Sequence, residues 1–328
     1  MKKIINNPND VVTQMLEGIA KANKSVQYIR EAEVITRSQK ANKVGIVSGG
    51  GSGHEPAHAG YVGKGMLDAA VAGNVFASPS PDRVLEGIKA ASSDKGVLLV
   101  IKNYSGDIMN FEMAKELAEA DGIEVDYVVV KDDVAVPDST YSTGRRGIAG
   151  TVYVHKIAGA KAEQGADLPE VKRVAQKAVD NVRSMGMAMS ACILPGVGKP
   201  GFTLGENEVE IGMGIHGEPG VERTQVITAA ELAKVLTGKI LDDLDYAGSE
   251  VALMVNGLGA TPLMELYILH NEVEKILSSK NIKIHSTLVG NFMTSLEMAG
   301  CSVTMLKLDD ELKALLDAPC DTPALKIF

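Results

Sequence analysis

The hydrophobic pattern of the first 130 residues alternates between helical and strand-like segments. Residues 10–22 carry apolar side chains at helical spacing, which predicts an amphipathic helix. The segment 43–56 begins as a β-branched run and ends in a glycine cluster, as a buried strand does when it meets a functional loop. Continuous apolar runs at 97–103 and 125–130 are typical of buried parallel strands, and 107–122 between them has a helical pattern.

This order of strand, helix and strand predicts an α/β fold with a mostly parallel sheet flanked by helices. Parallel strands joined through helices form right-handed crossovers, and their loops gather at the carboxyl ends of the strands. We therefore expect the segments 48–56 and 102–107 to face one crevice. Residues 151–185 predict two helices joined around 165–169, with little strand character, as a closing helical layer.

The second part of the chain has a different hydrophobic pattern, in which short strand-like segments outnumber helical ones. The strand-like segments are 187–194, 208–215, 251–255, 282–289 and 302–307, and the helical ones lie near 228–236 and 261–278. We therefore predict two domains. Residues 1–185 form an α/β domain that carries the GGGSGH and KNYSGD loops, and residues 186–328 form a smaller α+β domain.

Length and charge narrow the class of protein. A chain of 328 residues exceeds the ~250 to 300 residues at which single cores stop growing, which favours two domains. The formal net charge is -9 and no basic run occurs, so neither nucleic acid nor an anionic membrane is an expected partner. No apolar run approaches the ~20 residues that cross a bilayer, and the first residues lack a signal-peptide pattern, which predicts a cytoplasmic protein.

Cysteine and histidine spacing gives no support for a metal site. The three cysteines, Cys192, Cys301 and Cys320, lie far apart and form no CxxC pattern, so neither a disulfide framework nor zinc is expected. His54 and His58 superficially suggest a metal-binding helix, but Pro56 and the preceding glycines argue against a regular helix there. We favour His54 as a general acid or base. We interpret His58 as a polar residue on a first helical turn.

The glycine cluster between Ser48 and Gly60 could let backbone N–H groups approach a ligand and form an oxygen-binding nest. It is not a P-loop, because it lacks the Gly-Lys-Ser/Thr ending, and the nearest downstream lysine is Lys64. We therefore do not expect this chain alone to bind a nucleotide.

Charged residues follow the strand at 97–103. Lys102 and Asp107 place a cation and a carboxylate over the same strand end, an arrangement that a kinase site requires. Asp107 could instead cap the helix that follows, a role worth ~1 kcal/mol and no catalysis. Position alone leaves both interpretations of Asp107 open.

His216 stands between glycines within the segment 211–220, with Glu218 and Pro219 just beyond it. A histidine flanked in this way can be held rigidly while its ring stays accessible, which suits a nucleophile that attacks a carbonyl. A histidine on a surface loop would show the same pattern, so the pattern alone leaves both open.

Six ordered motifs together resemble the dihydroxyacetone kinase K-subunit family. They are GGGSGHEPAHAGYVG near residue 50, VIKNYSGDIMNFEMA near 105, DDVAV with STGRRG near 140, GIHGEPG at 214–220, NGLGATPLMELY near 260 and DAPCDTPAL near the end. The resemblance implies that His216 adds through a ring nitrogen to the ketone carbon of dihydroxyacetone and forms a hemiaminal. A polyol such as glycerol has no carbonyl to trap.

The resemblance also implies the remaining site residues. The catalytic residues are His216, His54 and Asp107, of which His54 and Asp107 deprotonate or orient the terminal hydroxyl of the substrate. The family's other substrate-binding positions fall on Gly51, Ser52, Gly53 and Lys102, and no metal ligand is implied.

The same resemblance implies partners. The chain stops at Phe328 without an appended nucleotide-binding domain, which resembles the subunit type. That type receives phosphate from a separate L subunit, which carries ADP and Mg and is recharged through the M subunit of a phosphoenolpyruvate phosphotransferase system. The chain itself is then expected to bind no cofactor and to form a homodimer. The alternatives are a dihydroxyacetone-sensing co-activator paralogue without kinase activity and a self-sufficient ATP kinase.

Overall fold

Two six-stranded sheets form the framework of the computed structural model, which describes residues 2–137 and 143–328. The first sheet has the order β1 (Val26–Ile29), β2 (Val34–Arg37), β4 (Ala69–Val75), β3 (Gly45–Ser52), β5 (Val97–Lys102) and β6 (Val125–Val130). The second has the order β11 (Lys283–Gly290), β10 (Glu250–Gly257), β12 (Gly300–Leu308), β7 (Val182–Ala188), β8 (Glu208–Ile211) and β9 (Glu222–Gln225). A short antiparallel pair is formed by β13 (Cys320–Asp321) and β14 (Lys326–Ile327).

The strand directions confirm the predicted fold class. In the first sheet β4, β3, β5 and β6 run parallel, and the antiparallel strands β1 and β2 lie at one edge. In the second sheet only β10 and β11 are parallel, and the other neighbours are antiparallel. The protein is therefore a mixed α/β fold, with a mostly parallel sheet followed by a mostly antiparallel one.

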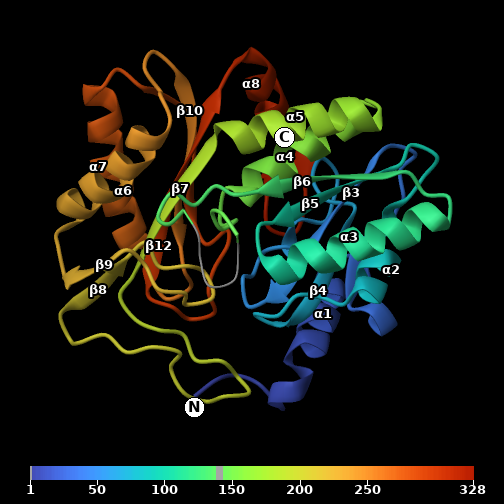
Figure 1. The fold of residues 1–328 in the computed structure, drawn as a ribbon, viewed down its shortest axis with the longest axis horizontal. Coiled ribbons are helices and arrows are strands. Elements are labelled where there is room, and N and C mark those ends of the chain that lie inside the picture. Colours follow the sequence, from blue (N-terminus) through green and yellow to red (C-terminus); the bar gives the residue numbers. More distant parts are fainter. Residues whose placement is uncertain (1, 138–142) are drawn as a thin grey trace.

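Helices cover both faces of the first sheet and the outer face of the second (Figure 1). The helices are α1 (Val11–Ala22), α2 (Pro81–Ala91), α3 (Ser105–Ala120), α4 (Thr151–Glu163), α5 (Leu168–Asn181), α6 (Ala229–Asp243), α7 (Leu263–Ser279) and α8 (Asp310–Asp317). Alternate residues of a strand point to opposite faces, so Val47 of β3 packs with α2 and α3 whereas Ile46 packs with α4 and α5. Met254 of β10 joins the cluster that contains Ile46, so α4 and α5 lie between the two sheets.

Beyond residue 181 the structure differs from the predicted pattern. Strand β7 begins at Val182, inside the segment for which helices with little strand character were expected. Strand β8 ends at Ile211, so residues 212–216 form a turn. Helix α8 returns to the first half, where Lys156 of α4 donates a hydrogen bond to the carbonyl oxygen of Leu315 at 2.6 Å. The division into domains 1–185 and 186–328 remains a prediction.

In the parts of the chain that the structure describes, none of the helices combines the length and the apolar character needed to cross a bilayer. The cytoplasmic location stays a prediction.

Candidate active site

A pocket of about 470 Å³ lies where loops of the two halves meet. Its walls are formed by Gly51, Phe76, Ser78, Tyr104, Ser105, Gly106, Asp107, Leu194 and His216. Gly51 lies at the carboxyl end of β3, Phe76 follows β4, and Asp107 lies in the first turn of α3 after β5. The carboxyl ends of adjacent strands therefore converge here, as the parallel sheet predicts.

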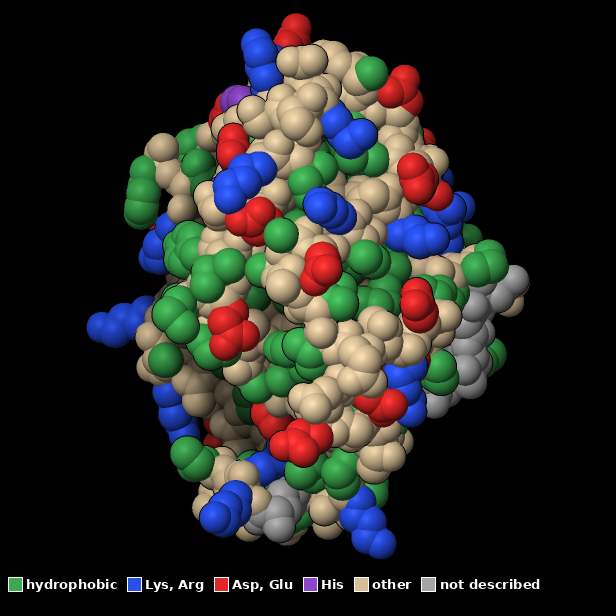
Figure 2. Space-filling view, turned by 90° about the vertical axis from the view of Figure 1, so that its left-hand side faces the viewer, with side chains coloured by type: hydrophobic (Ala, Val, Ile, Leu, Met, Phe, Trp, Pro, Cys, Tyr) green, Lys and Arg blue, Asp and Glu red, His purple; other side chains and the backbone are tan. Residues whose placement is uncertain are grey.

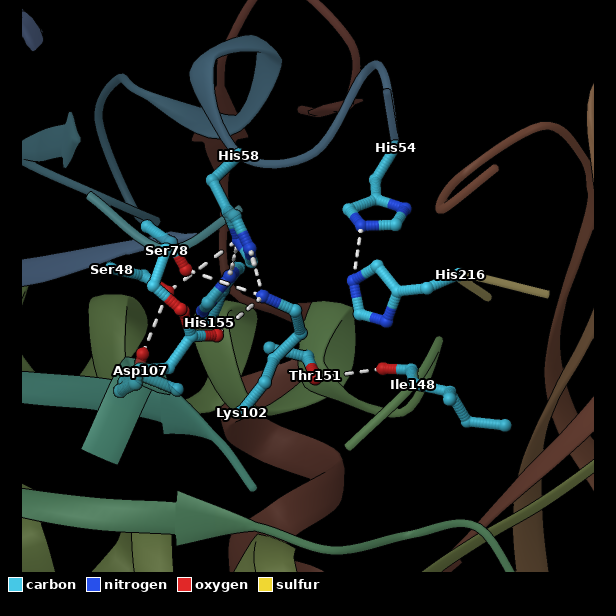
Figure 3. Close-up of polar contacts among 12 residues, drawn as sticks. Ser48, His54, His58, Ser78, Lys102, Asp107, Ile148, Thr151, His155 and His216 are labelled. Carbon is cyan, nitrogen blue, oxygen red and sulfur yellow. Dashed lines mark hydrogen bonds and ion pairs between the residues drawn. The ribbon is translucent and has the colours of Figure 1, made fainter. Parts of the chain in front are cut away.

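Two histidines from distant parts of the sequence meet beside this pocket. His54 follows β3 and is fully buried, and its Nε2 lies 3.0 Å from Nε2 of His216 (Figure 3). The ring of His54 stacks on Phe76, with centroids 5.1 Å apart. The rings of Phe76 and Tyr104 both meet His216 edge-on, with centroids 5.2 and 4.6 Å away. The aromatic rings thus fix the orientation of both imidazoles.

The hydrogen-bond partners limit where the protons of these histidines can reside. The carbonyl oxygen of Thr294 lies 2.8 Å from Nδ1 of His54 and can only accept, so Nδ1 carries a hydrogen. Nδ1 of His216 lies 3.0 Å from a Glu218 carboxylate oxygen and by the same reasoning donates to it. For the 3.0 Å contact to be a hydrogen bond, one of the two Nε2 atoms must carry a hydrogen and the other must accept it. Burial, with the charges of His216 and Lys102, lowers the pKa of His54 well below its usual value, so a protonated His54 gives that proton up readily.

Glu218 anchors His216 from behind. One carboxylate oxygen accepts the backbone N–H of His216 at 2.9 Å, and the other accepts Nδ1–H. Burial acts to raise the pKa of Glu218, but the hydrogen bond from His216 and the positive charges of His216 and Arg146 outweigh it and hold the pKa at about 2. The arrangement therefore keeps an ionised carboxylate directly behind the ring whose Nε2 faces His54.

Asp107 lies on the opposite wall and does not cap a helix. Helix α3 begins at Ser105, with Tyr104 at the N-cap position, so Asp107 belongs to the first turn. Its Oδ1 accepts a hydrogen bond from Ser78 at 2.5 Å, and its Oδ2 lies 3.4 Å from Nζ of Lys102. The helix-cap interpretation of Asp107 is therefore wrong.

Lys102 is only 1% exposed and is not among the residues that line the pocket. Its ammonium also contacts the carbonyl oxygen of Gly49 at 3.3 Å and Nε2 of His58 at 3.2 Å. These two contacts and Asp107 engage its three N–H groups, and its role as a direct substrate ligand stays a prediction. His58 stands at the N-cap of a short 3-10 helix, Ala59–Tyr61, close to the predicted helical turn, and its side chain is buried between Lys102 and His155.

The glycine run is a strand and not a loop, since β3 continues through Ser52 and pairs with β4. The hydroxyl of Ser52 donates to the carbonyl oxygen of Gly73 at 2.8 Å, and the N–H of Gly53 donates to Glu55 at 3.0 Å. Gly51 is the member of this run that borders the pocket. Substrate binding by Gly51, Ser52 and Gly53 remains a prediction.

Sequence reasoning missed several residues of the site. Glu218 was visible as a neighbour of His216 in GIHGEPG, but its role as an anchor was not inferred. Tyr104 stands in the KNYSGD loop, but its contact with His216 was not inferred. Phe76 carried no signal, because an isolated aromatic residue after a strand has many uses. Arg146, in the STGRRG segment, is buried and donates to Asp133 at 2.8 Å beside the same turn; Ser142 of that segment lies outside the described residues.

Within residues 2–137 and 143–328, no group of three or more His, Cys, Asp or Glu side chains is arranged to hold a metal ion. The described cysteines are all buried free thiols. That this chain binds no cofactor stays a prediction.

Comparison with known proteins defines the class of this fold and site. The Dak1 domain matches residues 17–324, and the chain therefore belongs to the Dak1 domain family. It is 55% identical to the dihydroxyacetone-binding subunit of the PTS-dependent dihydroxyacetone kinase 1 of Listeria innocua, over 99% of this chain and 100% of that protein. It is 43% identical to the corresponding subunit of the PEP-dependent kinase of Escherichia coli, over 99% of each chain.

Solved structures agree with this assignment. The dihydroxyacetone kinase from C. freundii, in complex with AMP-PNP and Mg²⁺, superimposes with a TM-score of 0.93 at 37% identity, over 99% of this chain and 61% of that one. A dihydroxyacetone kinase operon co-activator superimposes with a TM-score of 0.91 at 36% identity, over 95% and 97% of the two chains. The predicted K-subunit family and the kinase class of transferase are thereby confirmed.

Proposed function

We propose that this chain binds dihydroxyacetone covalently, as a hemiaminal on His216, and holds it for phosphorylation to dihydroxyacetone phosphate. The observation that carries the proposal is the position of His216, whose Nε2 faces both the pocket and His54 while Glu218 holds Nδ1. The names of the relatives, which are dihydroxyacetone-binding subunits, supply the substrate.

The capture step follows from the protonation of the two histidines. When His54 carries the Nε2 hydrogen, the lone pair of His216 Nε2 forms a bond to the carbonyl carbon, and the π electrons of the carbonyl move to its oxygen. His54 then gives its Nε2 proton to that oxygen. The resulting alkylated imidazolium keeps its Nδ1–H against the Glu218 carboxylate, which balances the new positive charge.

Covalent capture accounts for selectivity against polyols. Glycerol offers hydroxyl groups of the same kind as dihydroxyacetone but no carbonyl carbon, so no bond to His216 can form. Selection then rests on a chemical step and not on small differences in hydrogen bonding.

The phosphoryl step uses the other wall of the pocket. In this proposal Asp107, which lines the pocket, accepts the proton of a terminal hydroxyl as that oxygen attacks phosphorus, and such help is typically worth ~10² to 10⁴ in rate. The phosphoryl donor is a separate L subunit with ADP and Mg, recharged through an M subunit. The charge that the donor brings and the alignment of the hydroxyl supply the rest of the catalysis.

Intact-protein mass spectrometry tests the capture step. The unmodified chain should gain the mass of one dihydroxyacetone molecule, and His216→Ala should not. His285→Ala is the matched control, because His285 is exposed and also contacts a carboxylate, with its Nε2 2.8 Å from Asp317. An adduct that persists in His216→Ala would refute the proposal.

A second candidate function is a dihydroxyacetone-sensing co-activator without kinase activity. The observation in its favour is the TM-score of 0.91 to an operon co-activator. Asp107 favours the kinase, since a sensor needs no group beside the terminal hydroxyl. Reconstitution with L and M subunits and phosphoenolpyruvate separates the two, because a sensor would yield no dihydroxyacetone phosphate.

The proposed assembly includes a homodimer. The face made by α6, α7 and β8–β9 exposes apolar side chains between charged ones (Figure 2). They are Val226, Val235, Leu263, Met264, Tyr267 and Ile268. If this face pairs two copies, Met264→Lys should give monomers in sedimentation experiments, whereas Met109→Lys, which changes another exposed methionine, on α3, should leave dimers.

A further inference from the structure

A chain of buried polar side chains runs behind Asp107, away from the pocket. Nζ of Lys102 lies 3.4 Å from Asp107 Oδ2 and 3.2 Å from Nε2 of His58. Nδ1 of His58 lies 3.0 Å from Nε2 of His155 on α4 (Figure 3). All four residues are less than 7% exposed, so none of these groups can exchange its partner for bulk water without a rearrangement.

The chemistry of the donors fixes the direction of each hydrogen bond in this series of side chains. An ammonium group can only donate, so Nε2 of His58 accepts from Lys102 and the ring hydrogen of His58 sits on Nδ1. That N–H donates to Nε2 of His155, whose own hydrogen is therefore on Nδ1. Among the described residues this last N–H has no hydrogen-bond partner. Burial and the charge of Lys102 lower the pKa of both histidines, to about 3 for His155, which keeps them neutral acceptors.

The position of the Lys102 ammonium is thereby fixed from three sides. Its acceptors are the Gly49 carbonyl oxygen on β3, His58 in the segment after β3, and Asp107 on α3. Gly50 closes the space between them, because a Cβ at Gly50 would collide with Nζ of Lys102. His58 is the acceptor in this set that is neutral and aligned by a further side chain, His155. Loss of His58 would let the ammonium turn away from Asp107.

We propose that His58, held by His155, is a positioning residue for phosphoryl transfer: it fixes Lys102, and Lys102 in turn fixes the carboxylate of Asp107. His58 itself does not line the pocket and touches no substrate in this scheme. The inference rests on the proposed function and adds to it that the two reaction steps depend on different histidines. One pair of histidines, His54 and His216, captures the ketone, and a second pair, His58 and His155, acts only on the phosphoryl step.

The dependence of the two steps on different histidines gives a test with two readouts on the same protein. His58→Leu removes the acceptor, and His58→Gln keeps an acceptor oxygen near the place of Nε2. Both variants should form the dihydroxyacetone adduct as the unmodified chain does. In the system reconstituted with the phosphoryl-donating proteins, kcat should fall roughly 10²-fold in His58→Leu. In His58→Gln it should recover to within about tenfold of the unmodified chain.

His155→Met tests the second member of the chain without touching Lys102, and it should also lower kcat while the adduct forms. His285→Leu is the control and should change neither readout. Equal losses of kcat in His58→Leu and His58→Gln would overturn the inference, as would an unchanged kcat in His58→Leu. If His58→Leu does not fold, the comparison uses His58→Gln and His155→Met. A kcat that falls in His155→Met but not in His58→Gln then supports the inference. If the unmodified chain forms no adduct, the proposed function fails instead.

Discussion

At the scale of single residues, the charge of Glu218 couples the site to the stability of the fold. Its pKa is about 2, against an ordinary value of 4.5, so the ionised form is stabilised in the folded protein. A depressed carboxyl pKa gives stability that is present above about pH 4.5 and lost as the pH falls through about 2. The difference between the two pKa values corresponds to about 3 kcal/mol at neutral pH.

Glu218→Gln should therefore lower the free energy of unfolding by about this amount at pH 7, and by progressively less as the pH falls from about 4.5 toward about 2. Urea titrations of both proteins across this pH range measure the difference. Glu170→Gln is a useful comparison, because Glu170 also has a pKa of about 2 but is exposed on the surface, where ion pairs contribute little. A deficit in Glu218→Gln that is the same at every pH would contradict the argument.

Single residues also show how much of the site can be predicted from the sequence. His54, His216 and Asp107 stand in ordered motifs, and the structure brings all three to one pocket or its border. His155 could not be predicted, since it belongs to no motif and meets His58 only because α4 packs on the back of β3. Phe76 likewise reaches His54 through the fold alone.

At the scale of elements, glycine is needed in β3 because neighbouring atoms leave no room for a Cβ. Gly50 has a φ of +146°, a conformation that side chains other than glycine rarely adopt, and a Cβ there would collide with Lys102 Nζ. Gly50→Ala should therefore reduce kcat by displacing Lys102 from Asp107, and strain of this kind should destabilise the fold by roughly 1 to 3 kcal/mol.

Thermal unfolding and turnover of the reconstituted system measure both effects. The matched control is Gly238→Ala in α6, where the added methyl group would meet no described atom within 4 Å apart from its chain neighbours and the backbone of its own helix. That control should keep its activity and gain about 0.5 to 1 kcal/mol of stability. Full activity in Gly50→Ala would show that Lys102 tolerates displacement.

The elements also explain which predictions failed. A glycine run weakens a strand on its own, so the sequence pattern favoured a loop from Ser48 to Gly60, whereas β3 continues to Ser52. The strand persists because β4 lies so close that a Cβ at Gly49 would collide with the Val71 carbonyl oxygen. The beginning of strand β7 was missed because the strand follows α5 directly, at Val182, with no turn residue to mark the change; the predicted strand started only at residue 187.

At the scale of the whole molecule, the site exists only because the two halves pack together. His54 follows a strand of the first sheet, and His216 lies on a turn beyond β8 of the second, 162 residues later. Hydrophobic periodicity predicted the sheets but contained no information on how they meet, since α4 and α5 lie between them. The meeting of the two histidines could be expected only through the resemblance of their motifs to a known family.

A covalent adduct at this junction should stabilise the folded molecule as a whole. A ligand that binds only the folded state adds about 2.7 kcal/mol at a free concentration one hundred times its dissociation constant. Dihydroxyacetone should therefore raise the melting temperature, and glycerol at the same concentration should not. His216→Ala should show no rise with either compound, whereas His285→Ala should respond as the unmodified chain does. An equal rise with glycerol would mean that the pocket recognises hydroxyl groups and not the carbonyl carbon, and covalent capture would then have no part in selectivity.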